Sequence, residues 1–101
     1  MTIEGSLRGL NNKDTFKRTL EPGRHSYCIR NNGGGVLRFK IKTIDEGKWR
    51  VAETRSKIKS RRSVKGEFFV SDESANNVEF IFSKAFGAFR SEYELEYQQE
   101  S

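Results

Sequence analysis

The chain has 101 residues, of which 34% are hydrophobic and 33% are charged, and its net charge is +5. This length allows one domain with a workable core and no disulfide or metal staples, and the single cysteine, Cys28, excludes an internal disulfide and favours a reducing compartment. No apolar run approaches the roughly 20 residues that span a bilayer, and residues 1–5 do not resemble a signal peptide, so a cytoplasmic protein is expected.

The first half of the chain predicts short strands, because apolar and polar residues alternate there in brief segments. Gly, Pro, Asn and Asp residues separate these segments, which is typical of turns. Trp49 is expected to face the core. The predicted strands cover residues 3–7, 16–20, 25–29, 37–41 and 49–51, with turns at 11–14, 21–23, 31–35 and 45–47.

The basic residues gather in one part of the chain. Residues 48–65 contain eight Lys or Arg and one acid, so they carry +7 and the rest of the chain carries −2. The alternation fades after Ala52. Residues 54–65 are therefore predicted to form a basic loop or an edge strand with polar sides.

The last third of the chain, residues 68–97, predicts three consecutive strands. Alternation is clear in residues 68–70, 78–82 and 93–97, and residues 72–77 form a turn between the first two segments. Eight of the twelve aromatic residues lie in this third. A large part of the core is therefore expected here.

Regularly spaced short strands without an amphipathic helical period predict a single all-β domain, an antiparallel jelly-roll-like sandwich of seven to eight strands. Two of these strands carry opposite charges on alternate residues. If they are neighbours, each opposite-charge pair would stabilise their register by roughly 0.2–1 kcal/mol; two solvated faces that never meet are the alternative. The cations are Arg38, Lys40 and Lys42, and the acids are Glu92, Glu94 and Glu96.

Three features occur in an order that resembles a known family. They are a turn-strand-turn-strand unit at residues 22–41, a strand at 47–51 that runs into a charged stretch, and a closing block at 66–97. The most specific part is the Phe-x-Phe-Ser-x-x-Phe-x-x-Phe run at residues 80–89, followed by an alternating last strand. Together they resemble the GOLD (Golgi dynamics) domain, the β-sandwich of p24 cargo receptors, Sec14-like lipid-binding proteins and a Golgi-associated acyl-CoA-binding adaptor.

The GOLD resemblance implies a non-catalytic, protein-binding adaptor in membrane traffic or lipid signalling, and it supplies no catalytic residues. The sequence shows no p24-type signal peptide, disulfide or membrane span, and Ile81 stands where a p24 domain would be expected to have a cysteine. The cytosolic, adaptor-like branch therefore matches better. A weaker resemblance is to the bacterial pre-peptidase C-terminal sandwich, through residues 14–16 and 93–95; that family is mostly secreted.

Candidates for catalysis and metal binding are few. His25 is the one histidine, and Cys28 at i+3 would lie on the other face of a strand. A catalytic or metal site would need further partners, so both are predicted to be ordinary strand residues. The glycines at 33–35 are predicted to form a hairpin turn, because a phosphate loop would need a following helix. Turn acids at 45–46 and 72–73 are predicted to be solvated.

The basic stretch is the one feature that favours a function. If it is extended, cations at alternate positions would project from one face as a ladder. A solvated or edge-protecting loop, a protein contact, an acidic-membrane contact and a nucleic-acid contact are all open for such a cluster. The candidate binding residues are Arg55, Lys57, Lys59, Arg61 and Arg62.

We therefore expect a non-catalytic interaction module that binds a protein partner, with acidic-membrane contact through the basic loop as a further role. The alternatives are a nucleic-acid-binding β-domain that uses the same loop and an accessory domain of the pre-peptidase C-terminal type. No catalytic residue, metal, cofactor or small-molecule substrate is predicted.

Overall fold

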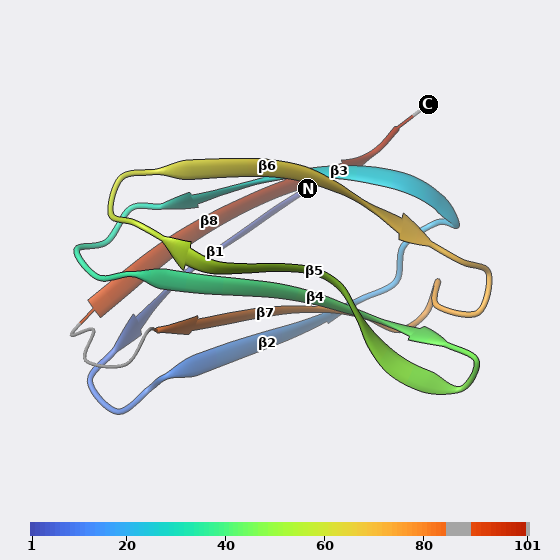
Figure 1. The fold of residues 1–101 in the computed structure, drawn as a ribbon, viewed down its shortest axis with the longest axis horizontal. Coiled ribbons are helices and arrows are strands. Elements are labelled where there is room, and N and C mark those ends of the chain that lie inside the picture. Colours follow the sequence, from blue (N-terminus) through green and yellow to red (C-terminus); the bar gives the residue numbers. More distant parts are fainter. Residues whose placement is uncertain (85–89, 101) are drawn as a thin grey trace.

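The computed structural model describes residues 1–84 and 90–100, and every regular element in this part of the chain is an antiparallel β-strand. Two four-stranded sheets pack face to face (Figure 1), which confirms the predicted β-sandwich. The strands are β1 (Thr2–Arg8), β2 (Lys13–Arg18), β3 (Gly23–Asn31), β4 (Leu37–Asp45), β5 (Lys48–Ile58), β6 (Ser63–Val70), β7 (Val78–Lys84) and β8 (Arg90–Gln99).

The chain changes sheet at almost every connection. Sheet A has the order β1-β8-β3-β6 and sheet B the order β2-β7-β4-β5. Among the described strands, β4 and β5 alone are consecutive neighbours, and their two-residue turn has positive φ at Glu46 (53°) and Gly47 (75°), as the right-handed twist of a hairpin requires. The hairpin predicted at residues 31–35 is wrong, because β3 and β4 lie in different sheets.

Most strands are longer than predicted, and two differences affect the argument. β2 begins at Lys13 rather than at residue 16, because its six residues pair with β7 from Lys13–Ser83 to Arg18–Val78. This pairing joins residues far apart in the sequence and leaves no local signal. The stretch at 54–65 contains the end of β5, a turn and the start of β6, so the basic residues lie along an edge strand of each sheet.

The closing strands supply much of the core, as their alternation predicts. Phe80 and Phe82 of β7 are fully buried, and they pack against Tyr97 and Tyr93 of β8 at ring-centroid distances of 4.9 and 3.9 Å. Phe69, between two buried neighbours, is 66% exposed. Each buried ring contributes roughly 1.5–3 kcal/mol of hydrophobic free energy. The predicted residues 85–89 lie outside the described part.

Trp49 does not face the core: it is 41% exposed on the outer face of sheet B, where the Lys17 ammonium lies 5.8 Å from its ring centroid. The reason is a β-bulge. Ile41 pairs with Glu53 but the next residue, Lys42, pairs with Val51, so Ala52 is an extra residue in β5. The extra residue breaks the alternation of β5, so Trp49 before it and Glu53 after it, four positions apart, point to opposite faces of the sheet instead of the same face.

Two tyrosines close the open sides of the sandwich in the same way. Tyr27 on β3 lies over Gly66 of the edge strand β6, and its hydroxyl donates to Glu53 Oε2 of β5 at 2.5 Å. A Cβ on Gly66 would be 2.6 Å from the Tyr27 hydroxyl. We call this arrangement of tyrosine, edge glycine and opposite-sheet carboxylate a tyrosine clasp.

The second tyrosine clasp lies on the other open side. Tyr93 on β8 lies over Gly5 of β1, and its hydroxyl donates to Asp14 Oδ2 of β2 at 2.5 Å. Burial, reinforced by Asp14, raises the pKa of Tyr93, and burial together with Glu53 raises the pKa of Tyr27. Each clasp therefore ties an edge of sheet A to an edge of sheet B through a protonated phenol.

We expect Gly66→Ala to lower the free energy of unfolding by about 1–3 kcal/mol, because the added methyl group overlaps the Tyr27 ring. Urea denaturation measures the change. Gly34→Ala is the control, since a Cβ there meets nothing within 4 Å and its φ is not in the left-handed region. Equal stabilities of the two variants would contradict the clasp.

We expect the stability of the protein to fall as the pH rises above 10.0, the ordinary pKa of tyrosine. In that range the unfolded chain has lost phenolic protons that the folded chain still binds, and such a difference favours unfolding as the pH rises. Tyr93→Phe should flatten this fall, while being less stable than the wild type at pH 7. Urea titrations between about pH 8 and 11 test this; an unchanged slope would refute it.

Candidate functional site

The basic segment forms one corner of the sandwich, where the chain passes from β5 in sheet B to β6 in sheet A (Figure 1). Four of the five predicted binding residues are exposed there, and none of the four forms a salt bridge within the described part of the chain. We call this set, Lys57, Lys59, Arg61 and Arg62, the cationic corner.

Arg55, the fifth predicted residue, has a structural role instead. Its Nε donates to the Tyr27 hydroxyl at 3.1 Å, and its guanidinium also donates to the Lys65 carbonyl and lies 3.6 Å from a Glu53 carboxylate oxygen. The hydrogen bond to Tyr27 raises the pKa of Arg55 further. Arg55 therefore completes the first tyrosine clasp.

The predicted ladder of alternate cations does not form. Leu37 pairs with Ile58 while Phe39 pairs with Arg55, so β5 contains a second extra residue at this point. After Ile58 the chain turns, with Arg61 at a positive φ of 62°. Because of the bulge and the turn, the Arg55 side chain does not share one face with the other four cations.

Hydrogen bonds to the end of β3 and to the β3–β4 connection hold the turn of the cationic corner. The Arg61 amide donates to the Asn31 carbonyl at 2.7 Å, and the Asn31 amide donates to the Arg62 carbonyl at 2.9 Å. Ser60 Oγ donates to the Gly33 carbonyl at 2.5 Å. These hydrogen bonds hold the backbone beneath the corner cations in place.

Asn31 is the centre of this arrangement and is fully buried. Its Nδ2 donates to the Gly35 carbonyl at 2.6 Å and to the Ile58 carbonyl at 2.8 Å, and its Oδ1 accepts from the Gly33 amide at 2.9 Å. A buried amide with all these partners joins the β3–β4 connection to the end of β5. The sequence gives no sign of this role beyond a turn-forming residue.

We expect Asn31→Ala to destabilise the protein strongly, by about 1–3 kcal/mol for each buried group that loses its partner. Thermal unfolding should show a lower midpoint, and Asn32→Ala, which changes an exposed neighbour, should leave it within the roughly 0.5 kcal/mol typical of surface changes. A small effect at Asn31 would mean that the turn is held by other contacts.

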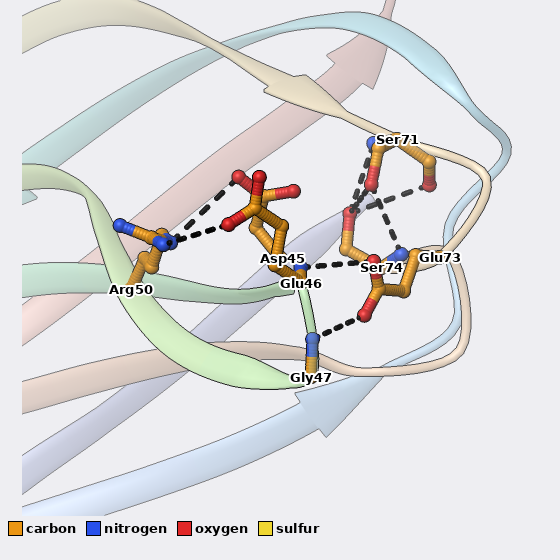
Figure 2. A network of polar contacts seen from close by, with 7 residues as sticks. All are labelled: Asp45, Glu46, Gly47, Arg50, Ser71, Glu73 and Ser74. Atoms are coloured by element: carbon orange, nitrogen blue, oxygen red, sulfur yellow. Dashed lines mark hydrogen bonds and ion pairs between the residues drawn. The ribbon is translucent and has the colours of Figure 1, made fainter.

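The opposite end of the sandwich carries the acids. Figure 2 shows how Glu73, from the β6–β7 connection, reaches the β4–β5 turn: its carboxylate accepts from the Glu46 amide at 2.9 Å and from the Gly47 amide at 2.6 Å. The nearby acids Asp45 and Glu46 pair with Arg50. Glu73 is exposed, as predicted for the turn acids, and its carboxylate in addition binds these two backbone amides of the β4–β5 turn.

Charge is thus distributed along the long axis of the molecule. The described connections at the end with the cationic corner contain three cations and no acid, and those at the other end contain four acids and no cation. Of the two arrangements left open for the β4 cations and the β8 acids, the structure has the one in which they never meet, because β4 lies in sheet B and β8 in sheet A. These charged rows face solvent on opposite sides of the sandwich.

His25 and Cys28 do not converge, as their spacing predicts. The His25 ring is buried against Phe68, with ring centroids 5.3 Å apart, and its Nε2 lies 2.8 Å from the Glu21 carbonyl oxygen. Cys28 is half-buried on the outer face of sheet A, in a groove of about 530 Å³. No group of three or more His, Cys, Asp or Glu within residues 1–84 and 90–100 could hold a metal ion.

A second groove, of about 380 Å³, lies on the same outer face beside β1 and was not predicted. Glu4, Ser6, Glu92 and Glu94 are among the residues that line it. The alternation in the last strand indicated that its acids share one face. The sequence does not reveal the order of strands in the sheet, so it could not indicate that β1 lies beside these acids.

The fold is similar to that of several solved structures. The Yersinia pseudotuberculosis-derived mitogen aligns with a TM-score of 0.65 and 10% identity, over all of this chain and 86% of that one. The pre-peptidase C-terminal domain of a Bacillus anthracis collagenase gives 0.60 and 16% over 97% and 88%, and PirA gives 0.56 and 20% over 96% and 93%.

These likenesses establish the sandwich fold alone, because the sequence identities are low. The pre-peptidase C-terminal domain is the weaker of the two resemblances that the sequence suggested, and its fold is shared by this chain. No protein-family profile and no curated protein sequence matches the chain. In the described part of the chain there is no helix long and apolar enough to cross a membrane.

Proposed function

We propose that this chain is a non-catalytic interaction module whose cationic corner binds an acidic surface on a partner protein. The observation that carries the proposal is the set of four exposed cations, free of salt bridges within the described residues. They lie at the end of β5 and on the following turn, which Asn31 and Ser60 hold in place. Because the backbone of the turn is already held by hydrogen bonds, binding does not have to order it, so more of the electrostatic attraction is available for affinity.

A role as a GOLD-like adaptor in membrane traffic or lipid signalling, in the cytoplasm, is our specific form of this proposal. A sandwich fold and an interaction surface away from the core are compatible with it. An accessory role like that of a pre-peptidase C-terminal domain is the alternative within the same class, and the fold likeness favours it. The structural roles of His25 and Arg55 support a non-catalytic module.

An acidic membrane or a nucleic acid would contact the same four cations through phosphate groups. A flat bilayer would need further cations in the plane of the corner. A single strand of nucleic acid would need exposed aromatic rings beside it. Among the described residues the exposed aromatic rings are Trp49 and Phe69, and they lie at the ends of β5 and β6 away from the corner. We therefore place a protein surface first.

The test compares binding of three probes at two salt concentrations: a glutamate-rich peptide, phosphatidylserine vesicles and a single-stranded oligonucleotide. Replacing the four corner cations with Ser should weaken binding of the acidic peptide by about tenfold or more, which corresponds to about 1.4 kcal/mol. The matched control replaces four cations on the outer face of sheet B with Ser, which removes the same charge. These control positions are Lys13, Lys17, Lys40 and Lys42.

Equal weakening by the two quadruple variants would mean that only net charge matters, and it would refute a site at the corner. If the vesicles or the oligonucleotide bind and the peptide does not, and if this binding is lost in the corner variant, then that ligand and not a protein is the partner of the corner. Arg55→Ser is a further check: it should lower stability through the clasp and should not share the binding phenotype.

A further inference from the structure

The outer side of β1 is an unprotected sheet edge. Of the described strands only β8 pairs with β1, in a continuous register from Thr2–Glu96 to Arg8–Arg90. The register contains no shift, so the strand is regular along its whole length. A regular edge strand of seven residues offers a row of backbone donors and acceptors to another strand.

The hydrogen-bond pattern shows which groups face outwards. The Met1 amine donates to the Tyr97 carbonyl at 3.0 Å, and the Tyr97 amide donates to the Met1 carbonyl at 2.9 Å. Such doubly bonded pairs recur at every second residue of an antiparallel ladder. The alternate residues Thr2, Glu4 and Ser6 therefore direct their N–H and C=O groups away from β8.

The other edges carry features that oppose strand addition. By the same alternation, counted from the bond between the Lys84 amide and the Asn12 carbonyl, the outward residues of β2 are Lys13, Thr15 and Lys17. β5 contains two register shifts, and β6, the other edge of sheet A, carries Lys65. Lysines and bulges at edges hinder pairing with another chain. β1 has no lysine, proline or bulge.

The side chains beside this edge define the charge of a suitable ligand. Glu4 lies directly opposite Glu94, and both line the groove of about 380 Å³ on the outer face. Like charges opposite each other destabilise a sheet. Neither Glu4 nor Glu94 forms a salt bridge within the described residues. Arg30 of β3 lies opposite Glu94, but its side chain donates to Asn32 and not to Glu94.

We propose that the β1 edge binds an extended peptide with basic residues at alternate positions, by strand addition. Its backbone would pair with Thr2, Glu4 and Ser6. Its cations would lie on the outer face and neutralise Glu4 and Glu94. A second copy of this chain is a poorer occupant, because antiparallel pairing of two β1 strands brings the acids of both copies to one face.

This proposal is independent of the proposed function, because the β1 edge and the cationic corner lie on opposite open sides of the sandwich. The probe is a blocked eight-residue peptide in which lysine alternates with threonine. We expect it to slow amide hydrogen exchange at Thr2, Glu4 and Ser6, and we expect the exchange of the amides of β2 to be unchanged.

Two variants of Glu4 test the site. Glu4→Pro removes an outward N–H that no described residue uses, and it should weaken peptide binding by about tenfold or more. Glu4→Lys keeps the N–H and reverses the charge, and it should weaken binding similarly at low salt. Thr15→Pro is the matched control on the β2 edge and should leave the affinity unchanged. Thermal melts confirm that each variant folds. If Glu4→Pro does not fold, the binding measured with Glu4→Lys decides whether the site exists.

Several outcomes would overturn the proposal. They are the absence of protection at the three outward amides, equal binding of a peptide that alternates glutamate with threonine, and binding that Thr15→Pro abolishes or that both Glu4 variants retain. The corner variant with four serines should bind the basic peptide normally. A loss there would assign the peptide to the corner, so failure of one proposal is distinguishable from failure of the other.

Discussion

A buried tyrosine hydroxyl must have a hydrogen-bond partner, and in this sandwich that requirement closes both open sides. Tyr27 and Tyr93 come from the two inner strands of sheet A, and each crosses a glycine on the adjacent edge strand to reach a carboxylate of sheet B. Three strands must be in register for each clasp to form. Each clasp therefore depends on the order of the strands, on a glycine in the edge strand and on the distance between the sheets.

The first clasp also separates structural from available charge in the basic segment. Arg55 is bound to Tyr27 and Glu53, whereas the cations of the corner lie at the end of β5 and on the turn supported by Asn31. A basic stretch that appears uniform in sequence therefore has two parts. Only the second part can meet a partner without weakening the fold.

The two proposed surfaces would give the module two partners of opposite charge. The cationic corner lies between the edge strands β5 and β6, and the acidic row lies along β8 beside the edge strand β1. Such an arrangement would suit an adaptor that holds two proteins at once. Structures with 10–20% identity share the fold, so the core pattern leaves these surfaces free to vary.

The sequence by itself determined the class of the fold, most strands and the closing aromatic core, because alternation along a strand reports which side chains are buried. The positions of Trp49, Arg55 and Asn31 were decided by tertiary structure. Two bulges in β5 changed the alternation of its side chains, and the Asn31 side chain acquired its partners from residues up to 27 positions away. Sheet order likewise separated the β4 cations from the β8 acids. Pairing between distant strands minimises free energy over the whole chain, and no local pattern records it.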